Sequence, residues 1–140
     1  MDGRQVIAEM RELMAEIEAG SHGISMDELR RIGKVKLDSW MRDTVDALFR
    51  GYRARERAIS RGGTDRGVLC EYKRINTAID DAIEAACFGY GEQVVSALRG
   101  NFFDGYGWRR SETSAYIAER TFYRIKKRCY LYVAVKLLMI

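Results

Sequence analysis

Residues 117–128 read IAERTFYRIKKR, and at the α-helical period of about 100° per residue the basic and apolar side chains separate onto two faces. The basic arc contains Arg120, Arg124, Lys127 and Arg128, with Thr121 and Tyr123 at its edges, and the opposite side contains Phe122, Ile125 and Cys129. The spacing therefore predicts a helix that is anchored by one face and presents positive charge on the other.

A helix with these two faces meets the requirements of a DNA recognition helix. In a helix-turn-helix, apolar residues lock the second helix onto a supporting helix, while polar side chains reach phosphates and base edges in the major groove. Ser111 can cap a short supporting helix from Glu112 to about Ile117, and the last helix is expected to begin between Glu119 and Thr121. The sequence therefore predicts a C-terminal helix-turn-helix.

The predicted DNA contacts divide by position along the last helix. Those in its first turns are expected to reach bases, namely Arg120, Thr121, Tyr123 and Arg124, and those one turn further on are expected to contact phosphates, namely Lys127 and Arg128. Arg109 and Arg110, just before the supporting helix, complete the basic set. Glu119 can accept a hydrogen bond from a cytosine amino group, and a favourable charge at the helix N-terminus explains it equally well.

Charge is unevenly distributed along the 140 residues. The net charge is +4, yet the segment from Gly107 to the end holds eight basic and two acidic residues. A second basic cluster, between Arg50 and Arg66, surrounds a glycine-containing segment. Segregated positive charge is typical of nucleic-acid binders. For the second cluster, a solvated helix face is the commoner explanation.

The composition predicts an all-α protein, a helical bundle with the helix-turn-helix at its C-terminal end. The chain contains no proline, and 47% of its residues are hydrophobic. Apolar spacing predicts helices over about 4–19, 25–59, 72–86 and 92–103, the second beginning with a capping box and bending near Gly33. We expect an N-terminal helical region at 1–60, a linker at 61–68 and a DNA-binding domain at 69–140.

Enzymatic and metal-binding classes find little support in the sequence. His22 is the single histidine, and no nucleophile–base pair or phosphate-binding glycine motif is present. Three cysteines without a CxxC pair suggest reduced thiols, and Cys87 and Cys129 occupy apolar positions where burial is expected. We therefore expect no enzyme, no cofactor and no metal, and a cytoplasmic protein without a signal peptide or membrane span.

The same C-terminal residues resemble those of the ArpU and RinA-type transcriptional regulators of phages and prophages in Gram-positive bacteria, whose C-terminal halves are similar to sigma-factor region four. The resemblance covers about residues 72–138. It rests on Ile117, Glu119, Arg120, Thr121, Tyr123, Arg124, Lys126, Lys127 and Arg128, preceded by the helix GEQVVSALRGNFF at 91–103. It implies a protein of the bacterial host cell and nucleoid that binds double-stranded promoter DNA, activates late genes, and has host RNA polymerase as a candidate partner.

Two questions stay open at this level. The last ten residues, LYVAVKLLMI, are apolar on nearly all sides and suit either a buried core or an interface with polymerase or a second copy in a homodimer. The alternatives to a transcription regulator are a phage DNA-packaging type DNA recruiter and a helical protein-interaction adaptor whose basic face meets an acidic partner.

Overall fold

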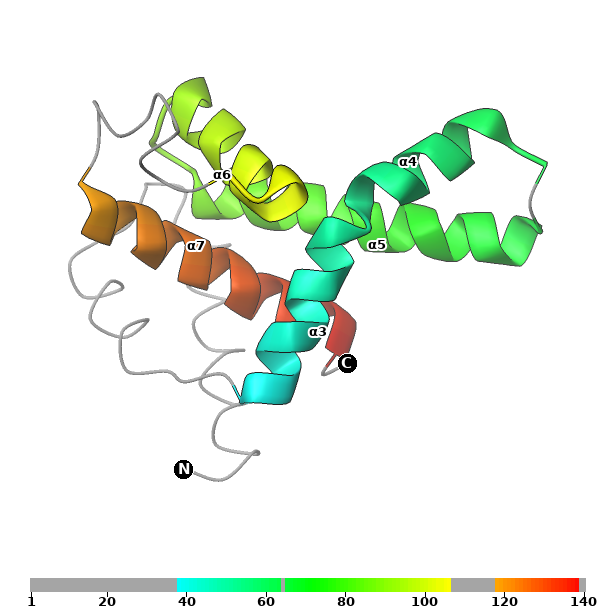
Figure 1. Ribbon diagram of the computed structural model, residues 1–140, viewed down its shortest axis with the longest axis horizontal. Helices are drawn as coiled ribbons and strands as arrows, with labels where there is room; N and C mark the ends of the chain where they lie inside the picture. Colours follow the sequence, from blue (N-terminus) through cyan, green and yellow to red (C-terminus); the bar gives the residue numbers. More distant parts are fainter. Residues whose placement is uncertain (1–37, 64, 107–117, 139–140) are drawn as a thin grey trace.

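The computed structural model describes residues 38–63, 65–106 and 118–138, and every regular element in these ranges is helical (Figure 1). The elements are α3 (Ser39–Arg50), α4 (Tyr52–Arg61), α5 (Arg66–Ala86), α6 (Glu92–Asp104), α7 (Glu119–Val133) and a π-helical turn (Ala134–Leu138). The predicted all-α class is confirmed. The predicted helices at 4–19 and 112–117 and the capping box at Ser25 lie outside the described residues, so the helix-turn-helix stays a prediction.

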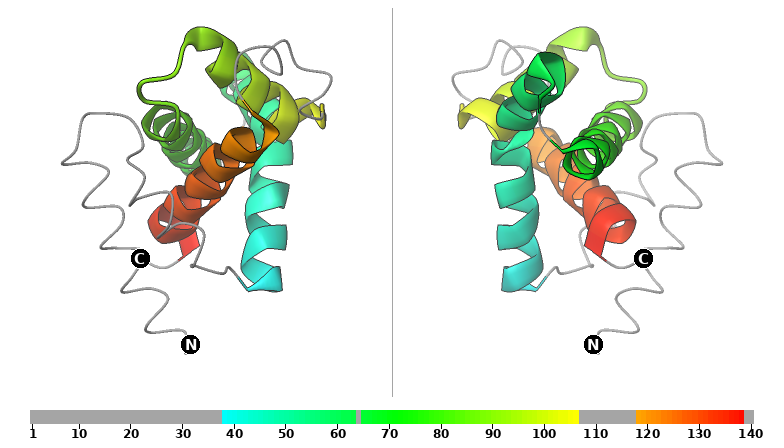
Figure 2. Two further views of the ribbon diagram at one scale, coloured as in Figure 1. Left: turned by 90° about the vertical axis from the view of Figure 1, so that its left-hand side faces the viewer. Right: turned by 90° about the vertical axis from the view of Figure 1, so that its right-hand side faces the viewer.

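Helix α7 occupies the middle of the bundle. Views along two further directions show α3 on one side of it and α5 on the other (Figure 2). Helices α4 and α5 pack side by side as a hairpin whose turn projects away from the other helices (Figure 1). None of the helices in the described ranges combines the length and apolar character needed to cross a membrane.

Three aromatic rings join α3, α6 and α7 at the centre of the core. The Phe49 ring stacks on Phe102 with centroids 4.0 Å apart, and the edge contact between Phe49 and Tyr130 spans 5.3 Å. Phe102 and Tyr130 also meet edge to face at 5.6 Å. Aromatic pairs in these geometries add about 0.5–1.5 kcal/mol each beyond the burial of their surface. Residues far apart in sequence are thereby held in one core.

The single helix predicted over 25–59 is divided in the structure. Helix α3 ends at Arg50, and α4 begins after Gly51. Arg55 folds back over this break, donating through Nη2 to the Leu48 carbonyl and through Nε to Asn76 Oδ1 at 2.7 Å. A Cβ atom on residue 51 would lie 2.5 Å from Arg55 Nη1, so glycine leaves the space that the guanidinium fills. The predicted bend at Gly33 lies outside the described residues.

The predicted boundary at 61–68 does not separate two domains in the described part of the chain. The segment is a turn between α4 and α5, in which Gly62 and Gly63 have positive φ and Asp65 Oδ1 accepts from the Gly67 amide at 2.8 Å. Helices α3 and α4 share one buried cluster with α5, α6 and α7. Apolar residues of α3 and α4 complete the core, so residues 38–60 belong with the C-terminal helices.

The apolar C-terminal segment is part of this core. Tyr130, Leu131, Tyr132, Val133, Ala134 and Val135 are all buried within the chain, with exposed fractions of 9% or less. Of the two explanations for residues 131–140, a buried core is therefore confirmed for 131–135. The homodimer gains no support from these residues, because their surface is already covered.

The contact between Gly51 and Arg55 predicts that Gly51→Ala changes the free energy of unfolding in opposite directions with and without the Arg55 side chain. Gly51→Ala should destabilise the wild-type background by about 1–2 kcal/mol, because the new methyl group displaces a guanidinium that satisfies two partly buried acceptors. In an Arg55→Ala background, the same substitution should stabilise by about 0.5–1 kcal/mol, because alanine loses less backbone entropy than glycine. Urea denaturation of the four proteins measures both values. Equal effects in the two backgrounds would contradict the packing described here.

Thiol reactivity provides a test of the core. Cys87 and Cys129 are buried, as predicted, and Cys70 is exposed. Burial raises the pKa of the Cys87 thiol to about 12 and also raises that of Cys129, so both stay protonated where an ordinary thiol of pKa about 8.5 begins to ionise. At about pH 8, a thiol-titrating disulfide reagent should modify Cys70 rapidly and the other two only after unfolding. Rapid reaction of all three in the native protein would argue against this core.

Candidate nucleic-acid interface

The first half of α7 has one anchored face and one free face. The helix begins at Glu119, within the predicted range, and Phe122, Ile125 and Cys129 each have an exposed fraction of 0%, which confirms the predicted apolar face. On the other side, Glu119 and Arg120 are exposed, and the Tyr123 side chain is 46% exposed. The packed face fixes the direction in which the free face points.

The other predicted contact residues fall into three groups. Thr121, Arg124 and Lys127 are partly exposed and lie beside the free face. Arg109 and Arg110 lie outside the described residues. Arg128, by contrast, is only 3% exposed. The six predicted contact residues between 119 and 127 are therefore all at least partly exposed, and three of them, Arg120, Arg124 and Lys127, carry positive charge.

The prediction that Arg128 contacts phosphates is wrong for this structure. Helix α5 packs along α7, and from Arg128 onward α7 is buried around its circumference. Arg128 lies close enough to Cys87, at the end of α5, for its positive charge to oppose the burial that raises the Cys87 pKa. Helical periodicity placed Arg128 on the basic arc, and it could not show that a neighbouring helix covers that part of the arc.

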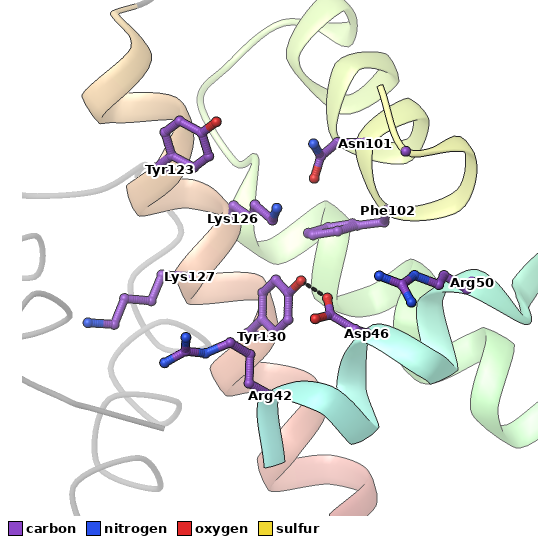
Figure 3. A pocket seen from close by; sticks show the side chains of 10 residues that line it. Arg42, Asp46, Arg50, Asn101, Phe102, Tyr123, Lys126, Lys127 and Tyr130 are labelled. Atoms are coloured by element: carbon purple, nitrogen blue, oxygen red, sulfur yellow. Dashed lines mark hydrogen bonds between the residues drawn. The ribbon is translucent and has the colours of Figure 1, made fainter. Parts of the chain in front are cut away.

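A groove opens between α3, α6 and α7, next to the free face of α7 (Figure 3). Its volume is about 610 Å³. It is lined by Arg42, Asp46, Arg50, Asn101, Phe102, Gly105, Tyr123, Lys126, Lys127 and Tyr130. Four of these side chains are basic and one is acidic, so the groove favours anions. Tyr123 and Lys127 belong both to this groove and to the predicted DNA-binding set.

The Lys126 side chain extends into the groove among three aromatic rings. Its ammonium group lies 6.0 Å from the Phe102 ring centroid, 5.9 Å from Tyr123 and 5.8 Å from Tyr130. Burial lowers the pKa of Lys126, and the nearby Asp46 carboxylate acts in the opposite direction. The aromatic rings stabilise the Lys126 ammonium group, but burial removes part of its hydration shell. An anion bound in the groove would replace part of that lost hydration.

Tyr130 links the groove to the core beneath it. Its hydroxyl donates to Asp46 Oδ1, which ties α7 to α3 at the floor of the groove (Figure 3). Burial and the hydrogen-bonded Asp46 raise the pKa of Tyr130 well above its usual value, so the hydroxyl keeps its proton. The Asp46 carboxylate is thereby oriented by a neutral donor.

Sequence reasoning found only part of this groove. Arg42 and Asn101 were missed, Arg50 entered only as a member of a charge cluster, and Lys126 entered only through the C-terminal charge and the family resemblance. The groove exists because α3 lies beside α7, and that pairing has no local signature in the sequence. The hydrogen bond between Asp46 and Tyr130 joins α3 to α7, and its two residues are 84 positions apart in the sequence. Only a prediction of that long-range pair would have located the groove.

The second basic cluster is largely structural where it meets the core. Arg53 forms two hydrogen bonds with Asp104, each 2.9 Å long, and Arg55 closes the α3–α4 break. Nearby, Arg99 lies over the Tyr52 ring at 5.1 Å and donates to Asp80 at 3.0 Å, joining α4, α5 and α6. Arg57, Arg61 and Arg66 of this cluster are exposed on the α4–α5 hairpin, and Arg53, although paired with Asp104, is exposed as well.

Comparisons of the chain with protein-family models, with curated proteins and with solved structures find no match. In the described ranges, no group of three or more histidine, cysteine or carboxylate side chains is placed to hold a metal ion. The free face of α7 and the adjoining groove are therefore the features from which a function is inferred.

The burial of Arg128 predicts that its substitution affects stability. Arg128→Ala should lower the free energy of unfolding by about 1–3 kcal/mol, because the alkyl stem is lost from a packed site. Lys127→Ala, one residue earlier and partly exposed, should change it by less than about 0.5 kcal/mol. Urea denaturation compares the two variants. Equal free energies of unfolding for the two variants would indicate that the Arg128 side chain is exposed rather than buried.

Proposed function

We propose that this chain is a sequence-specific DNA-binding transcription regulator that contacts double-stranded DNA through the free face of α7. The proposal rests on one observation, that the first half of α7 has a buried apolar face and an exposed basic face. Three side chains with no exposed surface hold it in place, while Arg120 and Tyr123 extend outward from its first two turns. A helix fixed in this way can enter a major groove with its N-terminal residues facing the base edges.

Contacts on the two sides of this face would have different roles. Arg120 and Arg124 suit hydrogen bonds to guanine, and Tyr123 offers a hydroxyl and an apolar ring. Lys127 suits a phosphate, and Arg42 on α3 is exposed beside it at the rim of the groove. Phosphate contacts of this kind position the helix on any duplex, whereas the base contacts select the sequence.

The more specific role rests on the resemblance to the ArpU and RinA-type regulators. It supports a phage or prophage protein that acts at a promoter in the bacterial cell, activates late genes and has host RNA polymerase as a partner. The free face of α7 is compatible with that role, because the apolar residues after Arg128 are used within the chain and leave the first half of the helix for DNA.

Two substitutions on α7 test base readout against phosphate contact. A preferred duplex is first selected from random-sequence DNA, and affinities for it and for a scrambled duplex are measured by fluorescence anisotropy at several salt concentrations. Arg124→Ala should weaken binding to the selected duplex by about 1–3 kcal/mol, with a much smaller effect on the scrambled one. Lys127→Ala should weaken binding to both duplexes equally. It should also reduce the slope of log affinity against log salt concentration by the amount expected for about one phosphate contact.

The matched control is Arg57→Ala, which removes an exposed arginine from the α4–α5 hairpin. It should leave the affinity for the selected duplex unchanged. Equal losses on both duplexes from Arg124→Ala would refute base-specific readout. Binding without any effect on a reporter promoter would favour a DNA-packaging recruiter, and no duplex binding at low salt would leave the protein-interaction adaptor.

A further inference from the structure

The groove between α3, α6 and α7 has the size of a small-molecule site. Its volume of about 610 Å³ lies within the range of about 300–1,000 Å³ that is typical of ligand pockets. It is hollowed between three helices, whereas the DNA-binding face proposed for α7 is convex. The groove therefore has room for a compact ligand.

Its cations are arranged to hold an anionic group. Lys126 is partly buried in the interior, among its three rings, whereas Arg42 and Arg50 are exposed on α3 at the rim. Figure 3 shows the Lys126 ammonium and the Arg50 guanidinium on either side of the Phe102 ring. A phosphate would supply acceptor oxygens to both kinds of cation, and charge-assisted hydrogen bonds of this type are among the strongest in proteins.

Tyr123 on α7 and Asn101 on α6, which lie across the groove from each other, offer contacts for a planar base (Figure 3). Tyr123 is 46% exposed, so part of its side chain is accessible to a base. The Asn101 amide is oriented by its Nδ2, which donates to the Tyr106 carbonyl at 2.7 Å. Its Oδ1 faces the groove (Figure 3), where it can accept from an amino group of a base. Stacking on an aromatic side chain is worth about 1–3 kcal/mol per base.

One carboxylate, that of Asp46, also lines the groove, so the site is not purely cationic. Asp46 receives the Tyr130 hydroxyl at one oxygen and lies at the groove floor between the cations. A negative group there disfavours a bare inorganic anion and suits a ligand that brings a hydroxyl donor as well as an anion. A ribose beside a phosphate provides both.

We propose that this groove binds a nucleoside phosphate, with its phosphate near Lys126 and Arg42, its sugar near Asp46 and its base on Tyr123 beside Asn101. The ligand is a free nucleotide or the terminal nucleotide of a single strand, since the recognised chemistry is the same. The site does not depend on duplex binding by α7, although Arg42, Tyr123 and Lys127 border both surfaces.

Isothermal titration calorimetry of the full chain tests the proposal with four probes: adenosine 5′-monophosphate, adenosine, inorganic phosphate and a short single-stranded oligonucleotide. The monophosphate should bind at least about tenfold more tightly than adenosine or inorganic phosphate, because only it combines the contacts to the phosphate with those to the base. Tighter binding by the oligonucleotide would identify a strand end as the source, and equal or weaker binding would identify a free nucleotide. Both outcomes support the site.

Lys126→Met removes the charge and keeps the length of the side chain, and it should weaken monophosphate binding by about 10–100-fold. Lys136→Met is the matched control, since Lys136 also lies over a tyrosine ring, 5.6 Å from the Tyr132 centroid, and does not line the groove. Its affinity should equal that of the wild type. Should Lys126→Met fail to fold, as judged by circular dichroism, Arg42→Gln on the exposed rim replaces it.

No binding of the monophosphate at millimolar concentration would overturn the proposal, as would an unchanged affinity in Lys126→Met. Inorganic phosphate binding as tightly as the monophosphate would show an adventitious ion only. Arg120→Ala separates this site from the proposed DNA function, because Arg120 does not line the groove and its loss should weaken duplex binding alone. Failure of one function therefore leaves the other measurable.

Discussion

The contacts of the Phe49 ring determine where α3 lies, and the position of α3 determines much of the remaining architecture. Phe49 is 1% exposed, stacks on Phe102 of α6 and meets the edge of Tyr130 of α7. Helices separated by about half of the chain are thereby packed at one point. Because Tyr130 also donates to Asp46, the same ring that completes the core orients a carboxylate in the groove above it. Core packing and groove geometry thus depend on the same residues.

Periodic sequence patterns predicted the helices that are regular. Helices α6 and α7 lie where apolar spacing placed them, whereas α5 begins at Arg66, earlier than the predicted start at 72. Gly105 ends α6 in the left-handed conformation expected of a C-terminal glycine. The break at Gly51 was missed because the arginine that stabilises it contacts a carbonyl before it and an amide on α5 after it. Such a contact depends on tertiary structure and has no repeating spacing.

Charge counts were less informative than hydrophobic spacing, because arginine has several structural uses. Arg128 is buried, Arg55 closes a helix break, and Arg99 lies over two rings at 5.1 and 5.0 Å. A long alkyl stem and a planar head allow all of these environments. The groove could not be inferred from the sequence for a related reason: its cations come from α3 and α7, and only packing brings them together.

The shared position of Tyr123 has a thermodynamic consequence. Its ring belongs to the free face of α7 and to the wall of the groove, so a base stacked on it and a duplex pressed against it would compete for the same surface. Any such competition is reciprocal: the factor by which one ligand weakens the other is the same in both directions. Under the two proposals made above, Tyr123 would make the occupancy of the duplex sensitive to the concentration of the nucleotide.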